Sequence, residues 1–178
     1  MMNRTMTSYL GVAALTLAAG VATVGPSVAA PARAPAESCA VTWGSQPKKA
    51  ELVGAGGPMT QIRAGRNECY DRLVLDGGSF GWVEYVDEVR VDASGEVVPV
   101  RGGAKLRVIT NTADGTQVGP ELVNVSGWTT FRQVTSAGDW EGWLTMGLGV
   151  RARLPFRVFV LPAGSGPSRV VIDVAHRW

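Results

Sequence analysis

The sequence predicts an all-β fold, a β-sandwich or a partly closed barrel of about eight to ten mostly antiparallel strands. Three observations support this prediction. Glycine and proline are frequent, with 23 and 10 residues, and they separate short apolar segments. No long stretch has helical periodicity. A short aliphatic block also occurs twice, as Arg-Leu-Val-Leu-Asp at residues 72–76 and as Arg-Val-Val-Ile-Asp at residues 169–173.

Both copies of the block are predicted to be interior strands, because a continuous apolar run suits a strand that is covered on both faces. Each copy begins with an arginine and ends with an aspartate. An unpaired charge is costly to bury in mid-strand. We therefore expect Arg72, Asp76, Arg169 and Asp173 at the rim of a sheet, paired where the strands leave it.

The N-terminus is predicted to be an export signal, residues 1–30, with Arg4 ahead of an uncharged apolar run and small residues at 27–30. The alternative is a membrane anchor. A membrane span needs about 20 apolar residues, and this run is shorter. We expect cleavage, no membrane span in the mature chain and a secreted or extracytoplasmic location. Residues 31–40 read as a flexible linker, and residues 41–178 as one β domain.

The chain has two cysteines, Cys39 and Cys69. An even number of cysteines in an exported chain indicates a disulfide. The alternative is a reactive or metal-binding thiol pair, but the sequence shows no CxxC spacing and no histidine near either cysteine. We expect one disulfide and no metal.

The first half of the domain contains apolar segments separated by polar and glycine-rich turns. In order, we expect an edge strand or anchored arm at 41–43, a short helical turn at 48–52, an alternating segment at 59–64, a turn at 65–68, a strand at 70–76, a strand at 82–91, a turn at 92–95 and its hairpin partner at 96–100.

The second half follows the same plan. Residues 105–110 alternate as a half-buried strand does, and residues 144–150 place apolar side chains at every second position. In order, we expect strands at 105–110 and 129–135, a loop at 136–139, strands at 140–151 and 156–161, a turn at 164–167 and the second copy of the block.

The two blocks and their surroundings resemble the AMIN domain. Residues 70–76 are similar to its opening strand, and residues 154–174 to its second half. Gly-Asp-Trp-Glu-Gly at 138–142, followed by Gly-Leu-Gly-Val at 147–150, resembles most closely the AMIN-like domain of small exported bacterial proteins. The likeness covers about residues 41–178, with a long segment, 86–153, between the halves. It implies a non-catalytic module of the cell envelope that contacts peptidoglycan.

Several classes of function have little support in the sequence. The formal net charge is only +2, so no nucleic-acid partner is indicated. His176 is the single histidine, and no nucleophile elbow or phosphate-binding loop occurs. We expect no cofactor and no enzymatic activity. The enzymatic alternative is a hydrolase that uses Asp139 and Glu141, which lie on one side if that stretch is extended.

The six tryptophans are the feature of the sequence most informative about ligand binding, because sugar-binding modules present flat aromatic faces to pyranose rings. Trp140 and Trp143 flank Glu141 near a predicted loop and are candidate ligand-binding residues together with it; the alternative is that they fill the core. Arg72 and Arg169 are the remaining candidates, for peptide-stem carboxylates of a wall polymer. We expect binding to peptidoglycan or another cell-wall glycan, or alternatively to an envelope protein through a sheet edge.

Overall fold

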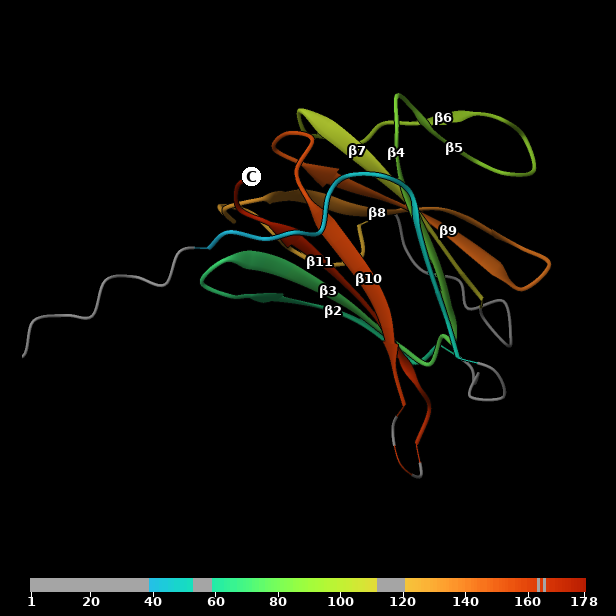
Figure 1. Ribbon diagram of the computed structural model, residues 1–178. Coiled ribbons are helices and arrows are strands. Elements are labelled where there is room, and N and C mark those ends of the chain that lie inside the picture. Colours follow the sequence, from blue (N-terminus) through green and yellow to red (C-terminus); the bar gives the residue numbers. More distant parts are fainter. Residues whose placement is uncertain (1–38, 53–58, 112–120, 163, 165) are drawn as a thin grey trace, which may run out of the picture. The chain divides into compact units, whose positions relative to one another are not determined.

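The computed structural model describes residues 39–52, 59–111, 121–162, 164 and 166–178 (Figure 1). Within these ranges the chain forms eleven strands, arranged in three sheets in which every pair is antiparallel. None of the described strands closes a sheet into a barrel. The fold is a β-sandwich, which confirms the all-β prediction.

The larger sheet, sheet A, has the order β1 (Lys48–Glu51), β4 (Phe80–Val86), β7 (Ala104–Asn111), β9 (Trp143–Val150) and β8 (Phe131–Trp140). The second, sheet B, has the order β10 (Phe156–Leu161), β11 (Arg169–Ala175), β3 (Tyr70–Asp76) and β2 (Gln61–Arg66). A short hairpin of β5 (Val89–Arg90) and β6 (Val97–Val98) forms the third sheet.

The core lies between sheets A and B and consists of the inward-facing residues of both. Each fully buried aliphatic or aromatic side chain contributes about 1.5–3 kcal/mol through its removal from water. The largest of them are Leu73, Leu75, Val83, Leu106, Val108, Phe131, Leu144, Met146, Leu148, Phe156 and Ile172.

The two copies of the repeated block are the neighbouring interior strands β3 and β11 and pair with each other. Because the pairing is antiparallel, Arg72 lies opposite Asp173 and Arg169 lies opposite Asp76. The prediction of interior strands is confirmed. The prediction of a rim position is wrong for Arg72 and Asp173, which lie within β3 and β11, and Asp173 is 0 % exposed. Burial is tolerated there because two arginines pair with this carboxylate.

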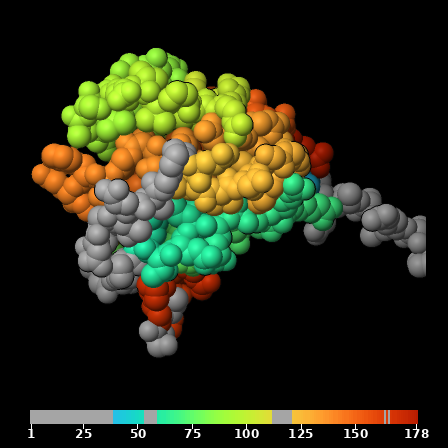
Figure 2. Space-filling model, turned by 180° about the vertical axis from the view of Figure 1, so that it is seen from behind, coloured from blue at the N-terminus to red at the C-terminus, as the bar shows by residue number. Residues whose placement is uncertain are grey.

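The segment between the two halves of the resemblance completes the sandwich, because it supplies β7, β8 and β9 of sheet A. Residues 87–101 also fold over the outer face of this sheet, as the lime-green segment above the orange strands in Figure 2 shows. Val89, Val100 and Ala137 form a second, small core at this contact. Gly147 and Gly149 lie beneath the segment, where a side chain would meet Val100 and the Arg101 carbonyl.

Several local predictions were wrong. The strand expected at 82–91 ends at Val86, and Val89–Arg90 form the separate strand β5. The strand expected at 140–151 begins only at Trp143, because residues 141–142 are the turn between β8 and β9. Residues 48–51 form strand β1 instead of a helical turn, because the open edge of β4 offers backbone partners from Phe80 to Val83. Residues 136–139 continue β8 instead of forming a loop, with a bulge between Ser136 and Asp139. Strand β2 extends to Arg66, so the turn that follows begins later than expected.

Cys39 and Cys69 form a disulfide across 30 positions of sequence, as predicted. Closure of a loop of this size contributes about 3–4 kcal/mol in the chain-entropy model. Residues 41–43 are an anchored arm, in which Trp43 packs edge-on against Tyr70. The predicted signal peptide and nearly all of the linker lie outside the described residues. Among the described residues no helix is long and apolar enough to cross a membrane.

Candidate functional site

The hairpin of β8 and β9 carries the predicted aromatic pair. Its two-residue turn, Glu141 and Gly142, has φ of 51° and 78°, which is the geometry of a type I′ turn. Trp140 and Trp143 therefore lie directly opposite each other at the tip. They are 55 % and 43 % exposed, and the orange tip projects at the left of Figure 2. The core-filling alternative is therefore excluded for both rings.

Glu141 occupies a position that favours asparagine or glycine. A left-handed conformation costs an ordinary residue about 1–2 kcal/mol. Glu141 is the one non-glycine residue with positive φ among the described residues, and its side chain is exposed. The turn also ends the extended stretch, so Asp139 and Glu141 do not have the strand spacing on which the hydrolase alternative depended.

Further aromatic side chains lie on the outer face of sheet A, next to the hairpin tip. Phe80 packs edge-on against Trp143, with ring centroids 5.2 Å apart. The Asn111 side chain fixes this contact, because its Oδ1 accepts hydrogen bonds from the backbone N–H groups of Ser79 (3.1 Å) and Phe80 (2.9 Å). We call Phe80, Trp82, Trp140 and Trp143 the aromatic platform.

Sequence reasoning missed Phe80 and Asn111. The spacing of Phe80 and Trp82 was a usable signal, because residues two apart in a strand lie on one face. Nothing in the sequence identifies Asn111 as the residue that holds Phe80. Trp128, another tryptophan beside a glycine, stacks on Phe131 at 6.0 Å and belongs to the half-buried edge of the core.

Arg72 is engaged within the protein. Its Nε donates to Asp173 Oδ1 at 2.6 Å and its second terminal nitrogen donates to Oδ2 at 2.9 Å. Arg157 of β10 donates to the same carboxylate at 2.8 Å. The Arg157 guanidinium also lies over the Trp43 ring, 4.4 Å from its centroid. This arrangement supports the structural interpretation of Arg72, that of a charge paired across strands.

Arg169 lies at the opposite end of the same strand pair, where its register partner is Asp76. Asp76 is held by Arg63 of β2, whose Nε and terminal nitrogen donate at 2.6 Å and 2.8 Å. These hydrogen bonds, which outweigh the opposing effect of desolvation, hold the pKa of Asp76 below its usual range. Arg169 adds to this effect through its charge. The two arginine candidates therefore have different surroundings.

The shifted pKa of Asp76 predicts a pH dependence. Because the pKa is lower in the folded state, the Arg63–Asp76 pair stabilises the protein above the ordinary pKa of 3.8. This contribution is lost as the pH falls through the lower, folded-state value. We expect Arg63→Gln to cost less than about 1 kcal/mol at neutral pH, because Arg63 is exposed, and the difference to vanish in acid. Urea unfolding of both proteins across this range measures it, and a constant difference would contradict the assignment.

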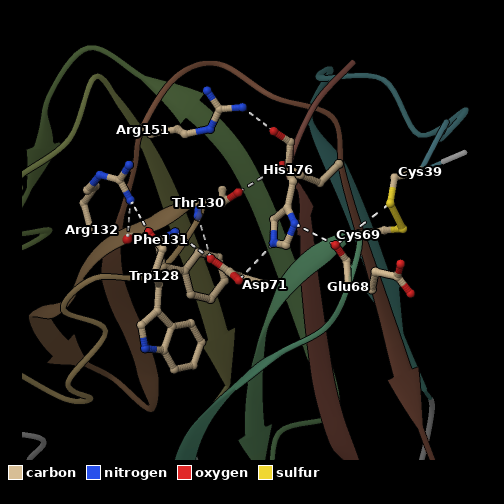
Figure 3. A network of polar contacts seen from close by, with 11 residues as sticks. Cys39, Glu68, Cys69, Asp71, Trp128, Thr130, Phe131, Arg132, Arg151 and His176 are labelled. Carbon is tan, nitrogen blue, oxygen red and sulfur yellow. Dashed lines mark hydrogen bonds and ion pairs between the residues drawn. A yellow bond between two sulfur atoms is a disulfide. The ribbon is translucent and has the colours of Figure 1, made fainter. Parts of the chain in front are cut away.

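His176 belongs to a network at the other end of the sandwich, shown in Figure 3. Its Nε2 lies 3.1 Å from Asp71 Oδ1 and its Nδ1 lies 3.0 Å from the Glu68 carbonyl oxygen. Both partners are acceptors, so both contacts are hydrogen bonds when both ring nitrogens carry a proton. His176 follows β11 directly.

Two of the candidate groups lie at one end of the sandwich. Strand β3 ends at Asp76 and β4 begins at Phe80, so the Arg169 end of sheet B is joined by three residues to the aromatic platform of sheet A. The two groups face outward from opposite sheets. Arg72 lies farther along sheet B. Among the described residues, no group of three or more His, Cys, Asp or Glu side chains is arranged to hold a metal ion.

A family model for the AMIN-like domain matches residues 57–176. The chain belongs to the AMIN-like domain family. This match confirms the predicted resemblance and includes β2 to β11, hence both copies of the repeated block and the aromatic platform. No curated protein matches the chain. The disulfide joins Cys39, which precedes the matched residues, to Cys69 within them, and disulfides are typical of proteins in oxidising compartments.

Proposed function

We propose that this AMIN-like protein is an exported, non-catalytic module that binds peptidoglycan or another cell-wall glycan through the tip of the β8–β9 hairpin. The observation that carries the proposal is the exposed cross-strand pair of Trp140 and Trp143. Two large apolar rings at a hairpin tip are costly to keep in water, and such surfaces are typical of binding sites. The disulfide and the family support an extracytoplasmic location.

The composition of the hairpin tip suits a carbohydrate. Flat indole rings pack against the C–H faces of pyranoses, and polar groups beside them bind the hydroxyls. Glu141 supplies an exposed carboxylate between the two rings, at a position where glycine or asparagine would relieve backbone strain. A strained residue of this kind is consistent with a binding role.

Retention on purified, insoluble peptidoglycan tests the proposal. We expect the wild-type protein to sediment with the polymer, and the Trp140→Ala/Trp143→Ala variant to lose at least about tenfold in apparent affinity, as expected when two aromatic anchors are removed. Loss of an exposed cross-strand pair costs about 0.2–1 kcal/mol of stability, so the variant remains folded. Circular dichroism and the unfolding midpoint check this expectation.

Trp178→Ala is the matched control, because Trp178 is 68 % exposed and lies outside the hairpin. Its retention should equal that of the wild type. Glu141→Asn tests the carboxylate separately, because asparagine suits the type I′ turn. If the wild-type protein is not retained, the glycan-binding proposal fails. A specific cross-linked partner in intact cells would then support the alternative, recognition of an envelope protein.

A further inference from the structure

The two copies of the repeated block have the same charges but pair them differently. Each aspartate has two arginines nearby. At Asp173, Arg72 and Arg157 both donate to the carboxylate. At Asp76, Arg63 alone occupies both carboxylate oxygens, through its Nε and a terminal nitrogen. The second arginine at Asp76 therefore finds the carboxylate already engaged.

That second arginine is Arg169. Its Nε is buried and has no hydrogen-bond partner, and it is the one buried side-chain nitrogen or oxygen of this kind in the described part of the chain. A buried donor that lacks an acceptor costs about 1–3 kcal/mol. In the equivalent position of the first copy, the Nε of Arg72 donates to a carboxylate at 2.6 Å. The comparison shows which chemical group would satisfy Arg169.

Arg169 also lines an open hollow of about 490 Å³ on the outer face of sheet B. Two arginines and one aspartate give the hollow an excess of one positive charge. Thr60 and Gln61 are exposed at its side. The Thr60 hydroxyl donates to the Asp76 carbonyl oxygen at 3.4 Å, and Gln61 offers amide donors. The hollow is lined by Thr60, Gln61, Arg63, Asp76, Pro167 and Arg169.

We infer that this hollow is a carboxylate-binding site. When a ligand binds, the Arg169 guanidinium rotates so that its Nε and one terminal nitrogen face the hollow. This pair of N–H donors, the fork, binds a planar oxyanion through two parallel hydrogen bonds. This rotation gives the buried Nε a carboxylate oxygen as its hydrogen-bond acceptor. The site lies on the sheet opposite to the aromatic platform and does not depend on glycan binding. Its assignment to peptide-stem carboxylates, by contrast, rests on the proposed function.

Nuclear magnetic resonance of the ¹⁵N-labelled protein tests this inference, because the arginine Nε–Hε signals report directly on the fork. The probes are acetyl-D-alanyl-D-alanine, the same dipeptide with an amidated C-terminus, and inorganic phosphate. We expect the free carboxylate to shift the Arg169 Nε–Hε signal in a saturable manner, and the amide to leave it unchanged. Arg169→Lys keeps the charge but lacks the fork, and should weaken binding about tenfold.

Arg72→Lys is the matched control, because it makes the same change in the first copy of the repeat, where Asp173 already occupies the guanidinium. Dipeptide binding by this variant should be unaltered. If either variant unfolds, the wild-type titration alone decides. Equal shifts with the dipeptide and its amide, or no shift with any probe, would overturn the site. Saturation by phosphate alone would overturn the carboxylate assignment. The Trp140→Ala/Trp143→Ala variant should still bind the dipeptide, which separates this site from the glycan-binding proposal.

Discussion

Replacement of Asp71 by alanine is expected to lower the free energy of unfolding by about 3–5 kcal/mol, as is typical when one partner of a buried charged network is removed. Asp71 is 0 % exposed. Its Oδ2 accepts hydrogen bonds from the backbone N–H groups of Thr130 (2.8 Å) and Phe131 (2.9 Å). Its Oδ1 contacts His176. The substitution leaves two buried donors without an acceptor and removes one of the links between the start of β8 and the end of β11 (Figure 3).

Urea unfolding followed by tryptophan fluorescence measures this effect as a shift of the midpoint. Asp71→Asn keeps the shape of the side chain and one oxygen acceptor, so we expect an intermediate loss. Asp87→Ala is the control, because Asp87 is exposed; its effect should stay within about 0.5 kcal/mol. A loss below about 1 kcal/mol for Asp71→Ala would show that water replaces the network, and would contradict its role as a tie between the two sheets.

The sequence was most informative where a local pattern determines the structure. The repeated aliphatic block predicted interior strands because five consecutive residues with charges at both ends suit a covered strand. Trp140 and Trp143 were selected because they flank Glu141 near a loop predicted at 136–139, although the turn itself lies between the two tryptophans. The cysteine pair was predicted from its even number and the expected export of the chain.

Long-range pairing was not accessible in this way. Arg72 and Arg169 occupy identical positions in the repeat, yet only Arg72 has its Nε on a carboxylate. The difference arises from the flanking strands, where Arg157 lies opposite Asp173 whereas Arg63 reaches Asp76 diagonally. Strand β1 likewise forms because β4 has an open edge. Asp71 was read as a strand residue, and its three partners come from segments more than 50 positions away.

The glycines of β9 also required the structure. The spacing at 147–149 entered the resemblance as a motif without a physical reason. The structure provides one, because residues 87–101 lie directly on the outer face of β9. Neither Gly147 nor Gly149 has a positive φ, so the requirement for glycine there is the absence of a side chain. The segment that covers sheet A therefore depends on two positions in a distant strand.

Replacement of Gly149 by alanine is the second substitution with a large expected effect. A Cβ at this position would lie 1.8 Å from the Arg101 carbonyl oxygen and 3.0 Å from a Val100 methyl group. A backbone atom cannot move aside as a flexible side chain does, so residues 87–101 must shift away from sheet A. The shift exposes the small core of Val89, Val100 and Ala137. We expect a loss of about 3 kcal/mol or more in unfolding free energy.

Urea unfolding measures the total loss, and hydrogen exchange locates it. In Gly149→Ala the amides of the β5–β6 hairpin should exchange faster, whereas those of β3 and β11 should keep their protection until global unfolding. Gly65→Ala is the matched control. Gly65 lies in β2, has an ordinary φ and has no atom within 4 Å of an added Cβ. Alanine there removes chain entropy from the unfolded state, so stability should be unchanged or rise by up to about 1 kcal/mol. Equal effects of the two substitutions would refute the close approach of residues 87–101 to β9.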